Sequence, residues 1–284
     1  MVGTVFLNRR FVAAARARVS VFDRGLLYGD GLFETLRVYR GEVFALDTHL
    51  ARLRASAVFL GIPLPRLDWT EIIGALVQRN RLMVRDASVR ITLTRGPASP
   101  GLVPPRRPHP TVLIVAAPLA GNIARAQRRG VRVTLLPLAR AADVLAGHKL
   151  LNYVPAILGR IAAASRNAFE ALYVDERKQL SEGTTSNLFI VRDGHLFTPP
   201  APRGVLPGIT RRLVIDLARH ERMPVHERTL RVPDLLAASE AFCTSSLIEI
   251  VPIVRVDDGA IATATPGPIT RLLQRRYRAM VARS

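Results

Sequence analysis

The chain has 284 residues, of which 49% are hydrophobic and 22% are charged, which is enough apolar mass for one large domain or two ordinary ones. Its formal net charge of +19 is spread along the chain, without a basic tail or interleaved aromatic residues, so we expect no nucleic-acid partner. The chain has one cysteine, Cys243, which excludes an internal disulfide and a Cys-rich zinc module. We therefore expect no metal site. A lone cysteine also suits a reducing compartment, so we expect a cytoplasmic protein. No signal-like or membrane-spanning apolar run is present, so we expect no membrane partner.

The N-terminal part of the chain is expected to alternate short strands and helices. Alternating polar and apolar residues indicate hairpins, and apolar residues three and four apart indicate helices. A Pro- and Gly-rich loop over 96–110 is long enough to be functional. The expected elements are hairpins over 4–12 and 36–46, helices over 47–60 and 70–82 (the second with Thr70 as its N-cap), and strands over 89–94 and 111–117.

A polar stretch without periodicity over 118–128 is the expected interdomain linker. It would separate an N-terminal α/β domain over 1–117 from a larger domain over 129–284, which together give an α/β or α+β fold class. Asp193-Gly194 is the strongest hairpin turn in the second domain. The elements expected there are strands over 131–137, 171–174, 188–198, 241–246 and 251–261, and helices over 152–169, 210–220 and 268–281.

The scarcity of lysine draws attention to Lys149. The chain has 39 Arg but only two Lys, so a position that remains lysine calls for a reason. A desolvated lysine amine loses its proton and attacks a carbonyl to form a Schiff base, which a guanidinium cannot do. Lys178 lies in a polar turn, where we expect an ordinary solvated surface lysine. Taken alone, Lys149 could have the same role.

A lysine that forms a Schiff base with a pyridoxal cofactor needs three further groups. These are an acid for the pyridinium nitrogen, a hydroxyl for the phenolic oxygen, and amides at a helix start for the phosphate. Glu182, Tyr153 and the helix start at Ile209 and Thr210 offer all three. Each alone also fits an ordinary turn, core or helix-cap residue.

Taken together, these residues resemble the signature of a known family. Lys149 is followed by SEGTTSNLF at 181–189 and GVLPGITR at 204–211, which resembles the class IV aminotransferases, the fold-type IV pyridoxal-phosphate enzymes. The runs YGDGLFETLR at 28–37, HLARL at 49–53 and TSSLIEIVP at 244–252 also match. The resemblance implies an N-terminal α/β domain, a larger C-terminal pseudo-barrel domain, pyridoxal 5'-phosphate between them, and a homodimer.

The resemblance also implies residue roles. Lys149 would carry the Schiff base and move the proton between the substrate and the cofactor, while Glu182 would pair with the ring nitrogen and Tyr153 with the phenolic oxygen. The phosphate ligands would be Arg52, the backbone amides of Ile209 and Thr210, and the hydroxyls of Thr210 and Ser246.

The family leaves two reactions open. The first is transamination between an amino acid (D- or branched-chain), or an R-amine, and a 2-oxo acid. The alternative is 4-amino-4-deoxychorismate lyase, which forms 4-aminobenzoate and pyruvate. Thr35, where the branched-chain pattern has Gly, and the pair Leu247-Ile248 are lyase-like. By contrast, the run TRGPASPGL at 94–102 lacks, after Arg95, the arginine that the lyase and the D-amino-acid enzymes often carry in this loop. We expect a transaminase, and the candidate substrate contacts are Tyr28, Phe33, Thr35, Arg95 and Leu247.

Overall fold

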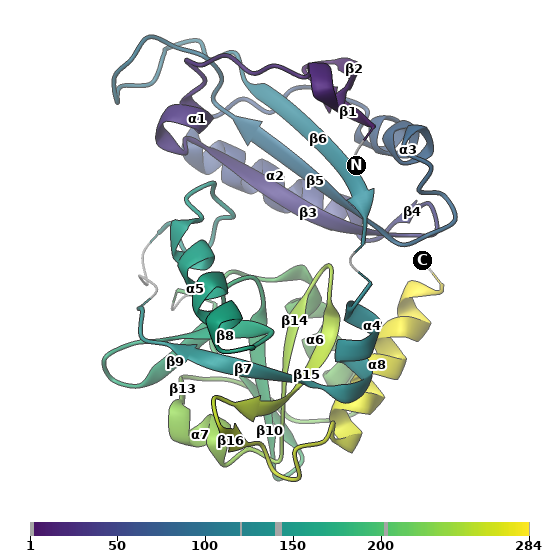
Figure 1. Ribbon diagram of the computed structural model, residues 1–284, viewed down its shortest axis with the longest axis vertical. Coiled ribbons are helices and arrows are strands. Elements are labelled where there is room, and N and C mark those ends of the chain that lie inside the picture. The colour runs from purple at the N-terminus through teal and green to yellow at the C-terminus, as the bar shows by residue number, and fades with distance from the viewer. Residues whose placement is uncertain (1–2, 120, 140–143, 202–203, 284) are drawn as a thin grey trace. The chain divides into compact units, whose positions relative to one another are not determined.

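The computed structural model describes residues 3–119, 121–139, 144–201 and 204–283 (Figure 1). The chain forms two compact units. Unit 1 consists of Met1–Ala120 and His148–Asn152, and unit 2 consists of Gly121–Gly147 and Tyr153–Ser284. The short segment that contains Lys149 therefore belongs to unit 1, although its neighbours in sequence on both sides belong to unit 2.

Unit 1 is built on an antiparallel six-stranded sheet in the order β2-β1-β6-β5-β3-β4. Two longer helices, α2 and α3, pack against it (Figure 1). Its strands are β1 (Thr4–Leu7), β2 (Arg10–Ala13), β3 (Gly31–Tyr39), β4 (Glu42–Val43), β5 (Ala87–Thr94) and β6 (Thr111–Pro118), and its helices are η1 (Ala14–Arg16), α1 (Arg24–Tyr28), α2 (Leu46–Leu60) and α3 (Trp69–Arg79).

The alternation of side chains along β3 separates the two faces of this sheet. Leu32 and Leu36 are buried in the core with Leu53 of α2 and Ile73 of α3. Since successive strand residues point to opposite faces, Phe33 lies on the other side of the sheet. This second face is the one that carries candidate site residues.

Local signals set the helix ends in unit 1. α2 ends because Gly61 takes a left-handed conformation with φ 62°, which glycine adopts without steric cost. α3 begins at Trp69, and Asp68 is its N-cap, accepting the Glu71 N–H at 2.9 Å. The expectation that Thr70 caps this helix was wrong, because the Asp68 side chain reaches the free amide first.

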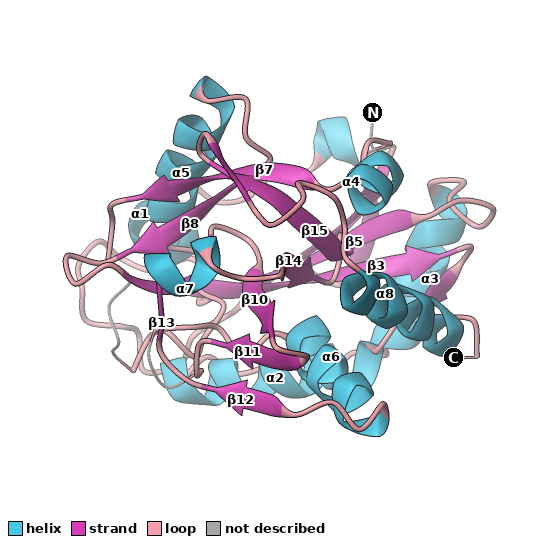
Figure 2. Ribbon diagram, turned by 90° about the horizontal axis from the view of Figure 1, so that it is seen from below, coloured by secondary structure: helices cyan, strands magenta, loops and turns pink. Residues whose placement is uncertain are grey.

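Unit 2 is built on a ten-stranded sheet in the order β12-β11-β10-β14-β15-β7-β8-β9-β13, with β16 paired to β15. The sheet coils into a half-barrel, as Figure 2 shows. Its strands are β7 (Val131–Leu136), β8 (Glu170–Val174), β9 (Gln179–Gly183), β10 (Asn187–Arg192), β11 (His195–Thr198), β12 (Val225–Glu227), β13 (Leu230–Arg231), β14 (Glu240–Ser245), β15 (Glu249–Val256) and β16 (Gly259–Ala260). Its helices are α4 (Ile123–Arg129), α5 (Val154–Ser165), α6 (Ile209–His220), α7 (Val232–Leu236) and α8 (Pro268–Val281).

The two neighbouring strands β10 and β14 are buried on both faces. Leu188 and Cys243 lie in the core of unit 2, and burial raises the pKa of the Cys243 thiol. On the other face the rings of Phe189 and Phe242 stack with their centroids 5.0 Å apart. Helix α6 packs against β14.

Most of the segment expected to be a linker, 118–128, belongs to regular secondary structure. β6 continues to Pro118, and α4 begins at Ile123. Ile123 and Ala126 are buried, and this burial stabilises a helix too short to show a clear period in the sequence. The helix expected over 152–169 is also shorter, since α5 ends at Ser165 and β8 begins at Glu170.

Within the residues described, no helix combines the length and the apolar character that a membrane span requires. The same residues contain no group of three or more His, Cys, Asp or Glu side chains arranged to hold a metal ion.

Candidate active site

Lys149 is held by backbone pairing with β3. The Phe33 N–H donates to the Lys149 carbonyl at 2.9 Å, and the Leu151 N–H donates to the Gly31 carbonyl at 3.1 Å. The Lys149 Nζ lies 4.5 Å from the centroid of the Phe33 ring. Main-chain hydrogen bonds with β3 therefore place the amine over an aromatic face.

His148 gives the lysine segment a second anchor, on α2. Its ring stacks on Phe59 at 4.0 Å between centroids, and its Nδ1 lies 3.0 Å from the Ser56 Oγ. Burial lowers the pKa of His148, which favours the neutral ring that stacks and accepts or donates one hydrogen bond. Sequence reasoning missed this residue, because its contacts lie about ninety positions upstream.

Arg52 belongs to a buried cluster with Glu34 and His49. The Arg52 Nε and Nη2 donate to the two Glu34 oxygens at 2.7 and 2.8 Å, a bidentate pair that fixes the plane of the guanidinium. The His49 Nδ1 lies 2.7 Å from Glu34 Oε2. Glu34 thus sets the direction in which Arg52 presents its remaining N–H groups.

The electrostatics of this cluster are unusual. Burial alone would raise the pKa of Glu34, but hydrogen bonds from Arg52 and His49, together with their charges, lower it to about 2. Burial lowers the pKa of His49 despite the opposing effect of Glu34, and the charges of Arg52 and Lys149 lower it further. The cluster therefore consists of a carboxylate, a guanidinium and a neutral imidazole that donates through Nδ1.

Phe33 and Thr35 share their face of the sheet with Arg90. Thr35 lies directly opposite Arg90 in the β3–β5 pairing, and the Arg90 guanidinium carbon is 3.6 Å from the centroid of the Phe33 ring. Both cations, Arg90 and Lys149, thus contact one aromatic ring. Arg90 was missed from the sequence, although its polar position in the alternating strand 89–94 was a usable signal.

Arg95, predicted as a substrate contact, is instead committed to the structure of unit 1. It donates to Asp30 and to the carbonyls of Leu60 and Gly61 at the end of α2, and it is buried. With four hydrogen bonds to the protein, its guanidinium has little capacity left for a ligand. We therefore withdraw this residue as a substrate contact.

Tyr28, the other predicted contact beside the loop 96–110, lies at the end of α1. Its hydroxyl accepts the Gly101 N–H at 2.9 Å, and the Arg24 guanidinium lies 4.9 Å from its ring centroid. Tyr28 therefore holds this loop, and it is exposed at 36%.

In unit 2, Glu182 is buried near the end of β9. Its Oε2 accepts the Asn187 Nδ2 at 3.1 Å and the Leu206 N–H at 3.0 Å. Two donors from different segments therefore define the position of the carboxylate.

The start of α6 lies beside this carboxylate. Gly208 is the N-cap and provides no capping side chain, so the first amides, those of Ile209 and Thr210, are available to an anion. A Cβ at Gly208 would lie 1.9 Å from the Asn187 Oδ1. Glycine is thus required for α6 to approach Asn187, the same residue that binds Glu182.

The strand next to Asn187 brings further predicted residues to this region. Asn187 pairs with Thr244 on β14, and Ser246 and Leu247 form the turn that follows this strand. The Thr244 Oγ1 is buried and has no hydrogen-bond partner within the described part of the protein. Tyr153 is half-buried as the N-cap residue of α5.

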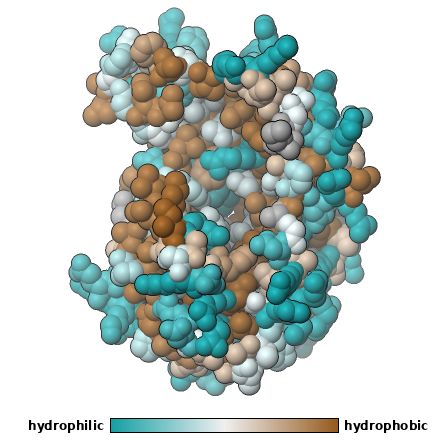
Figure 3. All heavy atoms as spheres, in the orientation of Figure 1, coloured by the Kyte–Doolittle hydropathy of each residue, from teal (hydrophilic) through white to brown (hydrophobic). Residues whose placement is uncertain are grey.

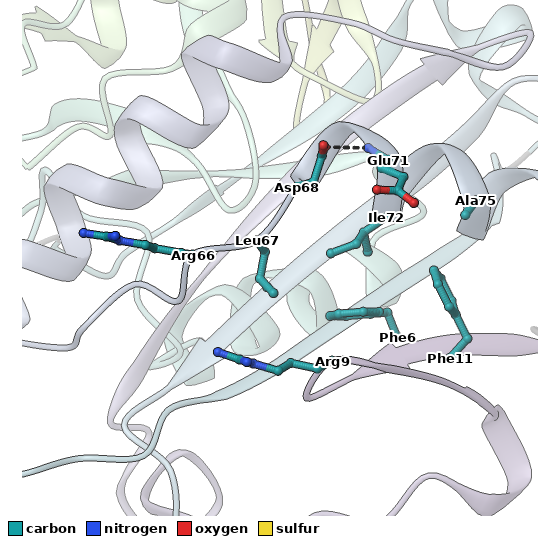
Figure 4. A pocket seen from close by; sticks show the side chains of 9 residues that line it. All are labelled: Phe6, Arg9, Phe11, Arg66, Leu67, Asp68, Glu71, Ile72 and Ala75. Carbon is teal, nitrogen blue, oxygen red and sulfur yellow. Dashed lines mark hydrogen bonds between the residues drawn. The ribbon is translucent and has the colours of Figure 1, made fainter.

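A cavity of about 320 Å³ lies elsewhere in unit 1, between α3 and the β1–β2 hairpin (Figure 4). None of the predicted site residues lines it. Of its two lining carboxylates, Asp68 and Glu71, the first is the N-cap of α3, and we assign the cavity no role.

Comparison with known proteins assigns the family. The sequence model of the amino-transferase class IV family matches residues 31–256. A Methanocaldococcus jannaschii protein with the provisional name branched-chain-amino-acid aminotransferase is 38% identical over 277 residues, covering 96% of this chain and 95% of its own. The D-alanine aminotransferase of Listeria monocytogenes is 34% identical, covering 96% and 94%. The chain belongs to the class IV aminotransferases.

Solved structures agree with this assignment. The branched-chain amino acid aminotransferase of Escherichia coli superimposes with a TM-score of 0.91 at 29% identity, covering 98% of this chain and 94% of that one. The predicted fold type is thereby confirmed. These proteins are all aminotransferases, so they do not favour the lyase alternative.

The family assignment also defines the cofactor. Class IV aminotransferases use pyridoxal 5'-phosphate. Two solved structures of another branched-chain amino acid aminotransferase, each 29% identical to this chain, contain pyridoxamine 5'-phosphate and N-(5'-phosphopyridoxyl)-L-glutamate. The residues present fit this group. Each unit by itself holds suitable groups: unit 1 has a lysine amine, and unit 2 has a buried carboxylate with defined donors, an uncapped helix start and the buried Thr244 hydroxyl. This enzyme is a pyridoxal-phosphate-dependent transaminase.

Proposed function

We propose that this enzyme transfers the amino group of an aliphatic amino acid, above all a branched-chain one, to a 2-oxo acid. The observation that carries the proposal is the pair of cations on the Phe33 ring, Lys149 Nζ at 4.5 Å and Arg90 at 3.6 Å. An aromatic face beside the reactive amine suits an aliphatic side chain, and the guanidinium suits a carboxylate. The provisional name of the archaeal relative supports the same substrate class.

The residues of each unit have distinct proposed roles toward the cofactor. Unit 1 supplies the Lys149 amine as the covalent attachment point and Arg52 as a phosphate ligand. Unit 2 supplies Glu182 for the ring nitrogen and Tyr153 for the phenolic oxygen. The remaining proposed phosphate ligands are the amides of Ile209 and Thr210 and the hydroxyls of Thr210 and Ser246.

The chemistry follows from these roles. When bound, pyridoxal 5'-phosphate supplies an electron-withdrawing ring that stabilises negative charge on the substrate α-carbon. The buried Glu182 carboxylate keeps the ring nitrogen protonated. Once the substrate amine has displaced it from the cofactor, the Lys149 amine would accept the proton from the substrate α-carbon as a base and then give it up as an acid.

A half-reaction panel tests the substrate. The purified protein, mixed with L-leucine, L-valine, D-alanine or R-phenylethylamine in single turnover, should convert the visible band of the bound cofactor fastest with the branched-chain L-amino acids. The D-alanine aminotransferase relative at 34% identity makes D-alanine the second candidate. Faster conversion by D-alanine would reject the branched-chain proposal.

The proposed assembly is a homodimer, acting in the cytoplasm. Exposed apolar residues support a protein partner surface. Those on α5 recur at helical spacing, and Figure 3 shows apolar side chains gathered over this helix. The exposed residues are Val154, Ile157, Leu158 and Ile161 on α5, and Val21, Phe22, Leu26 and Leu27 at α1. Light scattering during size-exclusion chromatography would test the dimer, and an Ile157→Glu variant should shift it toward the monomer.

A further inference from the structure

Three hydroxyl residues of the signature, Thr184, Thr185 and Ser186, have no role in the proposed chemistry. We propose that they bind Glu170, and that Glu170 is a positioning residue that holds Glu182 in place. This inference rests on the proposed function only in the role of Glu182 toward the cofactor. The geometry itself lies wholly within unit 2.

Glu170 is a buried carboxylate whose hydrogen-bond donors come mostly from a single turn, and the Arg160 Nη1 also lies 3.7 Å from its Oε1. Its Oε1 accepts the N–H groups of Ala171 at 2.9 Å and Thr184 at 3.2 Å, and the Thr184 hydroxyl. Its Oε2 accepts the Thr185 N–H at 3.3 Å, the Thr185 hydroxyl at 3.1 Å and the Ser186 hydroxyl at 3.0 Å. Five of these six donors belong to residues 184–186. The three hydroxyls are therefore used inside the protein and do not contact a ligand through these bonds.

The turn is also fixed sterically. A Cβ at Gly183 would lie 2.4 Å from the Ser186 Oγ and 3.0 Å from the Glu170 Cγ. A Cβ at Gly159 of α5 would lie 2.2 Å from the Thr184 Cγ2. Two glycines thus allow α5 and the end of β9 to approach the side chains of the turn, and a Cβ at either position would collide with them.

This turn connects Glu182 to Asn187, one of the two residues that donate to the Glu182 carboxylate. Glu182 lies one residue before Gly183, and Asn187 directly follows Ser186. The Gly183 N–H donates to the Ser186 carbonyl at 2.7 Å and closes the turn. The Asn187 Nδ2 then reaches back to Glu182 Oε2 at 3.1 Å. A fixed turn therefore fixes the spacing between a carboxylate and its donor.

The energetics make the arrangement stiff. The Glu170 side chain is 1% exposed, and a charge removed from water is tolerated only when hydrogen bonds satisfy it. The N–H groups and hydroxyls of the turn would in turn lose their acceptor if the Glu170 side chain were removed. If either the Glu170 carboxylate or the turn moved away, the hydrogen-bonding groups of the other would be left without partners. This favours a single conformation of the turn.

A Glu170→Gln variant tests the inference. Its side chain has the size of glutamate, but its NH2 group would face the N–H and hydroxyl donors of the turn. The matched control is Glu240→Gln. Glu240 is also buried in unit 2 and accepts the Thr270 hydroxyl and the N–H groups of Ile269 and Thr270. These bonds go to the start of α8 and involve neither Glu182 nor the turn. Both variants should lower the midpoint of thermal unfolding.

The decisive measurement is hydrogen exchange in the cofactor-free protein. The Leu206 N–H donates to Glu182 and does not contact Glu170. We expect its exchange to accelerate about tenfold or more in Glu170→Gln and to stay unchanged in Glu240→Gln. The Kd for pyridoxal 5'-phosphate, measured by equilibrium dialysis, should also rise about tenfold in the first variant only.

Normal Leu206 protection and normal cofactor affinity in a folded Glu170→Gln protein would overturn the positioning role, whatever the activity. A Glu182→Gln variant separates this result from failure of the proposed function. If Glu182→Gln leaves the affinity for the cofactor and the visible spectrum of the bound cofactor unchanged, the proposed role of Glu182 is wrong. The Leu206 exchange rate still tests whether Glu170 positions Glu182. Should Glu170→Gln not fold, Thr185→Val removes one hydroxyl at constant shape, and it should accelerate Leu206 exchange in the same direction.

Discussion

Glu34 and Arg52 form a bidentate ion pair in which both carboxylate oxygens accept from one guanidinium, at 2.7 and 2.8 Å. Glu34 lies on β3 and Arg52 on α2, so the pair joins the sheet of unit 1 to the helix that covers it. It also fixes the orientation of the cation that we propose binds the cofactor phosphate.

Replacing Glu34 by Gln should destabilise the protein and weaken cofactor binding together. Removing one partner of a buried pair lowers the free energy of unfolding by about 3 kcal/mol. Urea unfolding of the variant and the wild type would measure this loss. The guanidinium loses its fixed plane, so the Kd for pyridoxal 5'-phosphate should rise. A stable variant with normal affinity would show that Arg52 needs no positioning.

Acid should destabilise the protein in two stages through this cluster. The pKa of His49 is lowered from 6.5, so the unfolded state binds a proton below that pH while the folded state does not, and stability falls. The pKa of Glu34 is lowered from 4.5 to about 2, so its contribution of about 3 kcal/mol is present above pH 4.5 and is lost as the pH falls toward 2. Urea unfolding from pH 7 to pH 3 should show a smaller loss in His49→Gln than in the wild type. Equal slopes would contradict the assignment.

A Lys149→Arg variant should be folded but inactive. The guanidinium keeps a positive charge near Phe33, but it cannot attack a carbonyl. Borohydride should then no longer link the cofactor covalently to the chain, as mass spectrometry of the intact protein would show. Covalent labelling of this variant would refute the assignment of Lys149.

Arg90→Gln should raise the KM for the amino acid substrate by about tenfold or more, because a charged hydrogen bond to a carboxylate is lost. Cofactor affinity should not change. Arg54→Gln, at an exposed position of α2, is the control and should behave as wild type. An unchanged KM in Arg90→Gln would remove Arg90 from the substrate site.

Gly208→Ala should weaken cofactor binding and lower thermal stability, since the new Cβ would meet the Asn187 Oδ1 at 1.9 Å. The backbone of Gly208, with φ −65°, accepts alanine, so the effect is steric. Gly74 in α3 has no atom within 4 Å of its virtual Cβ, so Gly74→Ala should raise the free energy of unfolding by about 0.5–1 kcal/mol. Similar behaviour of the two variants would contradict the contact.

The sequence was sufficient for the fold type, the cofactor and the transaminase class, because these depend on short local runs around Lys149 and Glu182 and on hairpin turns such as Asp193-Gly194. The assigned roles of the individual site residues remain predictions. Local patterns failed where a short helix depends on tertiary burial, as in α4.

Long-range pairing was also beyond the sequence. Arg95 resembles a loop-edge cation, but its partners Leu60 and Gly61 lie about 35 positions upstream. Likewise, no local signal assigns Glu170 to three hydroxyls 14 to 16 residues further on.

The membership of His148–Asn152 in unit 1 has a consequence for the order of folding during synthesis. The chain passes from one unit to the other after residues 120, 147 and 152. Unit 1 therefore cannot complete its structure when its first 120 residues leave the ribosome. The partners of Gly31 and Phe33 arrive only with residues 149–151, more than a hundred positions later. Closing so long a loop slows folding, and a fragment cut after residue 120 would lack both these bonds and the reactive lysine.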